Sequence, residues 1–166
     1  MIVLGIDPGT RKTGLGLVQP QGRSYAARGY GTIRLDPDAP LVERLGVLHR
    51  ELASLLEQHH PDAAVVEGIF YSGAAGNYQS TLKLGHARGV VLLAVAQSRV
   101  PLAEYPPAEV KKALTGHGRA EKAQVRGMIC ALLRLATPPA EDASDALALA
   151  LCHCFRTEHA LTWREP

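Results

Sequence analysis

The chain of 166 residues has 46% hydrophobic, 20% charged and 5% aromatic side chains, and its formal net charge is +2. These values exclude a disordered tail and a coiled coil, and no apolar run reaches the ~20 residues that cross a bilayer. The first residues lack the basic segment and the cleavage site of a signal peptide. We therefore expect a globular protein of the cytoplasm that forms one domain over residues 1–166, with the last few residues flexible.

Three predicted strands open the chain. Residues 2–6 form a short apolar run that stops at Asp7, because the Pro8 that follows cannot donate to a central ladder. Strand-like patterns over residues 13–19 and 24–35 are separated by a turn sequence that contains proline and glycine. The pattern predicts an antiparallel meander.

Helices and strands alternate along the rest of the chain. The spacing of leucines over residues 41–60 predicts a long amphipathic helix, and residues 63–67 form a second apolar strand that ends on a carboxylate, Glu67. A helix over residues 82–98 and a strand over 100–105 follow. Three further helices are predicted over residues 108–115, 120–136 and 141–159. This order predicts an α/β fold, with a mixed five-stranded sheet and helices on both faces.

Several reactive residue types have structural interpretations. The chain has three cysteines, an odd number, and Cys152 and Cys154 point to different faces of a predicted helix. We expect buried, reduced thiols in place of a metal or redox site. His117 and His153 are likewise expected to be structural, because a lone histidine is seldom a metal ligand.

Basic residues concentrate between Lys111 and Arg126, where five of them accompany one acid, Glu121. Lys111 and Lys122 either contact the phosphates of a nucleic acid or belong to a solvated helix face. The composition of the segment allows both interpretations.

Four acidic residues are candidates for a functional site, two at the ends of apolar strands and two on one face of the last predicted helix. Asp7 and Glu67 each end an apolar strand, where an unpaired charge loses several kcal/mol of hydration. Asp142 and Asp145, three residues apart at the start of the last predicted helix, share one face. If that helix begins beside the strand ends, the four carboxylates converge, and oxygen-loving divalent cations remove their repulsion.

Each of these acids also has a purely structural interpretation. Asp7 can bond its own backbone in a turn, and Glu67 can face water at a strand end. Asp142 can cap the last helix while Asp145 complements its dipole. Glu141, four residues before Asp145, lies on the same helix face and adds a further candidate.

Short motifs occur along nearly the whole chain in a characteristic order and spacing. They are Gly5-Ile6-Asp7-Pro8-Gly9-Thr10, Val65-Val66-Glu67 with Phe70, Leu82-Lys83-Leu84-Gly85-His86-Ala87-Arg88-Gly89, Val110-Lys111-Lys112 with Glu121-Lys122, and Asp142-Ala143-Ser144-Asp145. Each motif alone is weak, but the ordered set resembles the RuvC family of Holliday junction resolvases.

The resemblance implies an RNase H-like fold and a homodimer that cuts four-way DNA junctions in recombination and repair. It implies hydrolysis that depends on two Mg²⁺ or Mn²⁺ ions and leaves 5′-phosphate and 3′-hydroxyl ends. It also implies contact with the branch-migration proteins RuvA and RuvB.

The resemblance also assigns roles to residues. The catalytic, metal-binding acids would be Asp7, Glu67, Asp142 and Asp145. The DNA-binding residues would be Phe70, Lys111 and Lys122. An exposed aromatic in a loop is expected to stack on a base, and the alternative is that Phe70 tucks under its own loop. The segment that follows Phe70 is a few residues longer than the family pattern leads us to expect.

The small residues of the predicted helix over 82–98 make it a candidate dimer interface, because they let another helix approach closely. The same residues could instead pack against the sheet of their own domain.

Two rival functions remain open at this point. The turn after Asp7 also resembles the first phosphate loop of actin-like ATPases and sugar kinases, but those proteins need two such halves and this chain has room for one. A junction-binding module without catalysis would keep the basic segment and have no use for four converging acids.

Overall fold

The computed structural model describes the backbone of residues 1–68 and 78–162 and the side chains of residues 1–68 and 79–157. The strands are β1 (Val3–Asp7), β2 (Lys12–Gln21), β3 (Ser24–Arg34), β4 (Ala63–Glu67) and β5 (Leu102–Tyr105). The helices are α1 (Leu41–His59), α2 (Tyr78–Gln97), α3 (Pro107–Thr115), α4 (Lys122–Leu133) and α5 (Glu141–Thr162). The strands form one sheet in the order β3-β2-β1-β4-β5, antiparallel from β3 to β1 and parallel from β1 to β5. The predicted mixed five-stranded sheet is confirmed.

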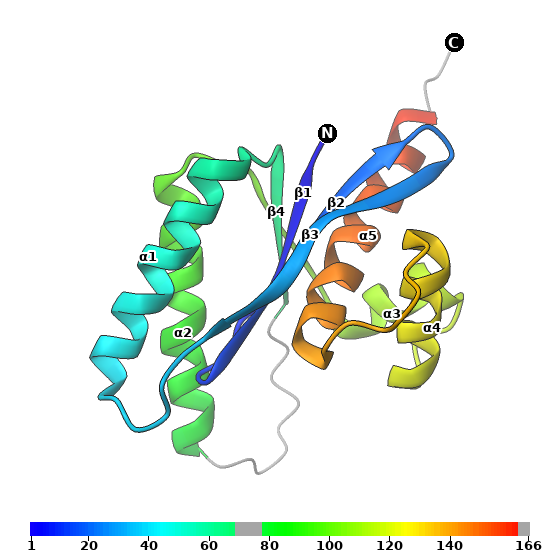
Figure 1. Ribbon diagram of the computed structural model, residues 1–166. Coiled ribbons are helices and arrows are strands. Elements are labelled where there is room, and N and C mark those ends of the chain that lie inside the picture. Colours follow the sequence, from blue (N-terminus) through cyan, green and yellow to red (C-terminus); the bar gives the residue numbers. More distant parts are fainter. Residues whose placement is uncertain (69–77, 163–166) are drawn as a thin grey trace.

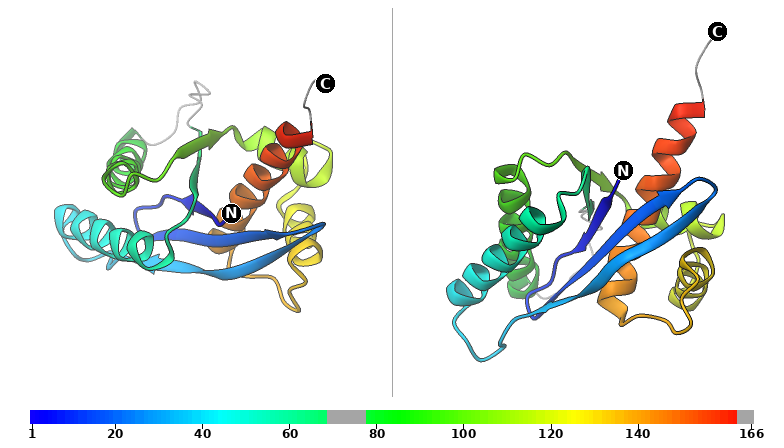
Figure 2. Two further views of the ribbon diagram at one scale, coloured as in Figure 1. Left: turned by 90° about the horizontal axis from the view of Figure 1, so that it is seen from above. Right: turned by 45° about the horizontal axis from the view of Figure 1, so that its top comes forward.

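Helices cover both faces of this sheet, as the sequence predicts. α1 and α2 lie on one face, and α5 lies on the other with α3 and α4 beyond it (Figure 1, Figure 2). Leu48, Leu52 and Leu56, at every fourth position of α1, are buried against the first face. Each such side chain contributes about 1.5–3 kcal/mol when it is fully removed from water.

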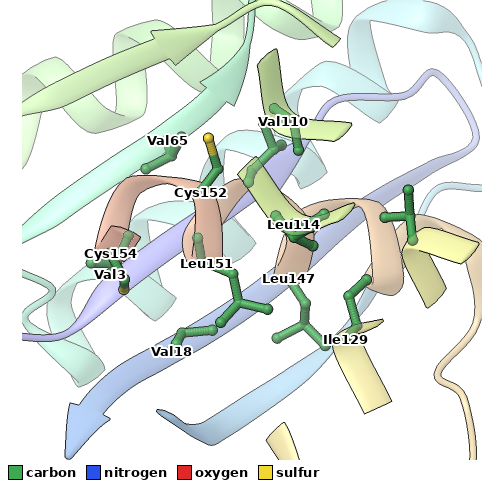
Figure 3. Packing of buried hydrophobic residues seen from close by; sticks show 14 of the residues in the cluster. Val3, Val18, Val65, Val110, Leu114, Ile129, Leu147, Leu151, Cys152 and Cys154 are labelled. Atoms are coloured by element: carbon green, nitrogen blue, oxygen red, sulfur yellow. The ribbon is translucent and has the colours of Figure 1, made fainter. Parts of the chain in front are cut away.

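The second apolar core lies between the sheet and α5. Leu147 and Leu151 of α5 pack there close to Val18 of β2 (Figure 3). Cys152 and Cys154 form no disulfide and are buried in the same core, as expected for packing residues. This core fastens α5 along β1 and β2 and so determines where the first turn of α5 lies.

The main differences from the predicted elements lie at their ends. β2 continues through Pro20, where the sequence predicts a turn, because its pairing with β3 reaches the hairpin at Gly22. α4 begins at Lys122 instead of residue 120, since Glu121 forms a capping box with Gln124 and stays outside the helix. The expected flexibility of the last few residues falls on 163–166, outside the described part of the chain.

Two further sequence predictions concern His153 and the membrane. The Nδ1 atom of His153 lies 2.8 Å from the Tyr105 hydroxyl, so this histidine connects α5 to β5. Within the described residues, no helix combines the length and the apolar character needed to span a bilayer.

Candidate active site

Two of the four acids lie side by side at the ends of neighbouring strands. Asp7 is the last residue of β1 and Glu67 the last of β4. These strands run parallel with Ile6 opposite Val66, so both carboxylates leave the sheet at the same edge. The strand residues before them are buried, whereas Asp7 is half-buried and Glu67 is exposed.

Glycines bring the start of α5 against the same edge. Gly14 of β2 pairs with Asp7, and a Cβ atom built on Gly14 would lie 1.9 Å from the carbonyl oxygen of Asp142. A Cβ atom built on Gly5 would likewise lie 1.8 Å from the Ala146 carbonyl oxygen. Only residues without a side chain permit such close packing of a helix on a sheet. The first turn of α5, with its two aspartates, is thereby placed beside Asp7.

A cavity of about 280 Å³ collects most of the predicted site residues. It is lined by Asp7, Glu67 and Asp145 and by both predicted phosphate-binding lysines, Lys111 and Lys122. A larger hollow of about 640 Å³ lies at the opposite ends of β4 and β5, but none of the four predicted acids lines it. The acids identify the smaller cavity as the candidate active site.

Burial and mutual repulsion make ionisation of these acids costly. Burial raises the pKa of Asp7 from its ordinary 3.8 to about 7. The carboxylates of Asp145, Glu67 and Asp142 contribute to the same rise, so all four acids share one electrostatic environment. Burial also raises the pKa of Glu67 and that of Asp145. This electrostatic arrangement favours a bound cation.

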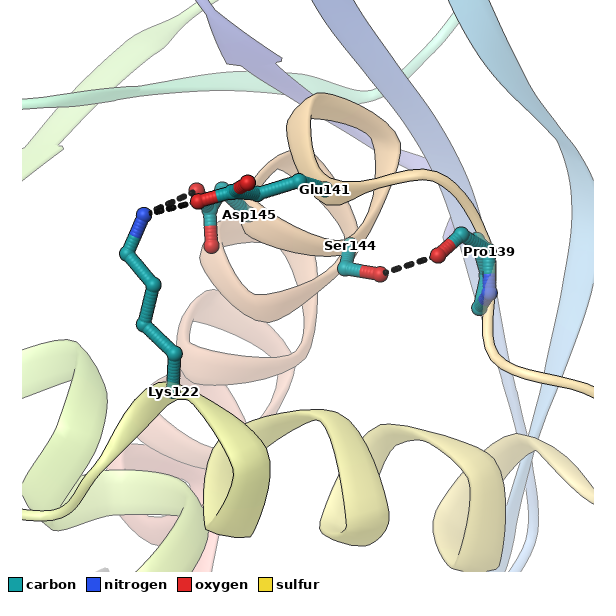
Figure 4. A network of polar contacts seen from close by, with 5 residues as sticks. All are labelled: Lys122, Pro139, Glu141, Ser144 and Asp145. Atoms are coloured by element: carbon teal, nitrogen blue, oxygen red, sulfur yellow. Dashed lines mark hydrogen bonds and ion pairs between the residues drawn. The ribbon is translucent and has the colours of Figure 1, made fainter.

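Lys122 reaches across from α4 to the first turn of α5 (Figure 4). Its Nζ atom donates to Glu141 and lies 3.9 Å from Oδ2 of Asp145. The hydrogen bond raises the pKa of Lys122 and lowers that of Glu141. Glu141, the additional candidate acid, therefore forms an ion pair with Lys122.

The four acids have the chemistry of a site for hard divalent cations, because carboxylate oxygens are the preferred ligands of Mg²⁺ and Mn²⁺. Burial first, and then repulsion from the neighbouring carboxylates, raise the pKa of Asp7, and a bound cation would favour its ionised form. Among the described residues, no three His, Cys, Asp or Glu side chains are arranged as a ready metal cluster. Coordination by all four acids thus requires their side chains to turn toward one another.

One neighbour of the site was not predicted. Arg88 of α2 lines a second cavity of about 280 Å³ that shares Asp7 and Glu67 with the first. The motif that contains Arg88 contributes to the family resemblance, but it does not indicate that this side chain is buried, because an arginine in a helix is ordinarily exposed. Phe70, the predicted base-stacking residue, and most of the longer segment after it lie outside the described residues.

The sheet topology and the acids at the strand ends define a class, that of the RNase H-like proteins. A solved structure of Thermus thermophilus RuvC superposes with a TM-score of 0.86 at 35% identity, covering 96% of this chain and 97% of that one. The structure of the same protein in complex with a Holliday junction substrate gives a TM-score of 0.88 at 36% identity, covering 96% of each chain. The expected RNase H-like fold is confirmed.

Sequence comparison identifies the family. The family model described as "Crossover junction endodeoxyribonuclease RuvC" matches residues 3–153. A relative of that name from Alkalilimnicola ehrlichii is 52% identical over 94% of this chain and 92% of its own length. Another, from Xanthobacter autotrophicus, is 54% identical over 91% of this chain and 88% of its own length. The chain belongs to the RuvC family.

Proposed function

We propose that this chain is a structure-specific endodeoxyribonuclease that resolves four-way (Holliday) DNA junctions in recombination and repair. The observation that carries this proposal is the cavity in which three acids from three separate elements meet two lysines. The family relation supports it, because the relatives carry the name of crossover junction endodeoxyribonucleases. The chain would act as a single domain in the cytoplasm.

The acids would hold the metal. Asp7, Glu67, Asp142 and Asp145 supply oxygen ligands for two Mg²⁺ or Mn²⁺ ions, which fits their shared repulsion. In such sites the ions lower the pKa of an attacking water and stabilise the charge on the leaving oxygen. The carboxylates orient the ions, and none of them attacks the phosphorus. Hydrolysis is expected to leave 5′-phosphate and 3′-hydroxyl ends.

The lysines would hold the DNA backbone. Lys111 of α3 and Lys122 of α4 approach the acidic cavity from the side of the two short helices. Their charges offset part of the repulsion that a phosphodiester meets near the carboxylates. Stacking of Phe70 on a base at the junction stays a prediction, as does contact with the RuvA and RuvB proteins.

A homodimer would deliver two cuts to one junction, since a four-way junction is resolved by two nicks and each chain has one acidic site. Leu82, Gly85, Gly89 and Leu93 follow one face of α2 by their spacing. Leu82 and Leu93 are about half exposed. Among the described residues outside the backbone of α2 itself, no atom lies within 4 Å of a Cβ position at Gly85 or Gly89, so packing against the rest of the described chain does not explain these glycines. Ala87 of the same helix, by contrast, is buried and packs in the core between α2 and the sheet.

Cleavage of a synthetic mobile four-way junction tests the proposed function. With Mg²⁺ or Mn²⁺ present, we expect paired nicks in strands of like sequence, while a linear duplex of the same sequence stays intact. Ligation of the products would verify the 5′-phosphate and 3′-hydroxyl ends. Equal cutting of junction and duplex, or no cutting with either metal, would contradict the proposal.

The two rival functions have less support. An ATPase half-domain is not indicated by the family relation. A junction-binding module without catalysis would have no reason to keep two acids with raised pKa values at the ends of β1 and β4. Junction binding without cleavage in any metal would favour that module.

A further inference from the structure

Arg88 is the only buried charged side chain among the residues that the structure describes, with 8% of its surface exposed. It lies on the inner side of α2, between the buried residues Ala87 and Val91. A guanidinium removed from water costs several kcal/mol unless strong acceptors surround it. The acceptors that surround the Arg88 guanidinium therefore indicate the role of this side chain.

Its contacts join the ends of two strands next to the acidic cavity. Nη1 donates a hydrogen bond to the carbonyl oxygen of Glu67, the last residue of β4. Nη2 donates to Oε2 of Glu104 on β5 at 2.6 Å. The planar guanidinium thus bridges two acceptors that a lysine could not bridge with the same geometry.

The bridge sits where regular pairing stops. The pairing of β1 with β4 ends at Val66, and on the other side β4 makes its last bond to β5 from the Gly68 N–H to the Tyr105 carbonyl oxygen, at 2.8 Å. Glu67 therefore leaves the sheet with support from one neighbouring strand. The bond from Arg88 to its carbonyl oxygen supplies support from α2.

We infer that Arg88 is a positioning residue, which holds the end of β4 so that the Glu67 carboxylate stays directed at the metal site. This inference rests on the proposed role of Glu67 as a metal ligand. Residues that orient metal ligands commonly change metal affinity or activity by about 10–100-fold when they are removed. Because Glu104 accepts the other hydrogen bond of the guanidinium, Glu104 helps to hold Arg88 in this position.

The test measures Mn²⁺ binding to the DNA-free protein by isothermal titration calorimetry. We expect Arg88→Met to weaken Mn²⁺ binding about 10-fold or more, since Met keeps the apolar stem and removes both hydrogen bonds. Arg88→Lys should lie between Arg88→Met and the wild type, because it retains the charge and one bond. Glu104→Gln should weaken binding in the same direction by a smaller factor.

Junction cleavage is measured on the same variants as a second readout. The loss should appear in the cleavage rate and in the Mn²⁺ concentration needed for half-maximal rate, while junction affinity without metal changes less than about twofold. Arg50→Met, on the exposed side of α1, removes a positive charge far from the site and serves as the matched control.

The outcomes separate this inference from the proposed function. A wild type that binds Mn²⁺ but cuts no junction refutes the proposed function and leaves the role of Arg88 testable by calorimetry. Mn²⁺ affinity within about twofold of the wild type in Arg88→Met overturns the inference. If Arg88→Met does not fold, Mn²⁺ affinity within about twofold of the wild type in both Arg88→Lys and Glu104→Gln overturns the inference. A wild type that binds no Mn²⁺ also overturns it.

Discussion

At the scale of single residues, the site is a compromise between stability and function. Asp7 completes a buried strand and lies near three further acids, which is unfavourable for the folded chain without a cation. Such a position is retained where binding needs it and not where folding alone is selected. Asp7 is therefore the residue at which the two demands are best separated by experiment.

Replacement of Asp7 by Asn removes one carboxylate while it preserves size and shape. We expect Asp7→Asn to abolish junction cleavage, because the proposed metal site would lose a ligand, and to leave junction binding intact. Denaturing gels measure the first effect and gel-shift titrations the second. Cleavage at the wild-type rate in this variant would remove Asp7 from the metal site.

The raised pKa of Asp7 also predicts how stability depends on pH. Between 3.8 and about 7 the folded chain keeps a proton on Asp7 that the unfolded chain has released. The free energy of unfolding of the metal-free protein therefore falls as pH rises through this window, by up to about 4 kcal/mol from this residue.

Urea unfolding at pH 5 and pH 8, with a chelator present, measures this effect. Asp7→Asn isolates the contribution of Asp7, because the other carboxylates are the same in both proteins. We expect the variant to lose less stability than the wild type between the two pH values. An equal loss in both proteins would show that Asp7 ionises normally.

At the scale of elements, the contact between α5 and the sheet decides where the acids meet. Main-chain atoms of α5 occupy the space that side chains at Gly5 and Gly14 would fill. Since backbone cannot yield as a flexible side chain can, any larger residue there has to displace the helix start.

Gly14→Ala tests this contact. The added methyl would meet the Asp142 carbonyl, so we expect a loss of about 1–3 kcal/mol in unfolding free energy and a larger loss of cleavage than of stability. Thermal unfolding and junction cleavage measure the two effects. Gly31→Ala on β3 is the matched control, because no atom of another described residue, apart from its two chain neighbours, lies within 4 Å of a Cβ atom at that position. Equal behaviour of the two variants would contradict the argument.

At the scale of the whole molecule, α2 has two different sides. Arg88 on its inner side contacts the end of β4, while Leu93 is 51% exposed on the outside. An apolar stripe on an exposed helix face is typical of an interface. One helix thus connects the proposed active site with the proposed contact between chains.

Leu93→Lys is expected to convert a dimer into a species of 17.8 kDa, because it places a charge in the apolar stripe. Sedimentation at micromolar concentration measures the change. Val42→Lys on α1 is the control, since Val42 is also apolar and 74% exposed but lies on another helix. A wild type that sediments as a monomer, or a variant that remains dimeric, would exclude this face as the dimer interface.

Much of this protein follows from local sequence. The leucine spacing of α1 and the apolar runs of β1 and β4 determine these elements, because burial of a periodic apolar face depends on neighbours in the chain. The ordered motifs identify the family and nominate Asp7, Glu67, Asp142 and Asp145. The hairpin through Pro20 and the start of α4 at Lys122 differ from prediction, because strand pairing and capping override local preference.

Only the tertiary structure decides which charges meet. Glu141 and Asp142 are neighbours in the sequence, yet Glu141 pairs with Lys122 while Asp142 adds to the field at Asp7. Arg88 gave no sign in the sequence that it would be buried against Glu67. The physical reason is that these contacts join residues far apart in the chain. For Asp142, the distance to Asp7 depends on how closely α5 can approach the sheet, and the absence of side chains at Gly5 and Gly14 permits that approach.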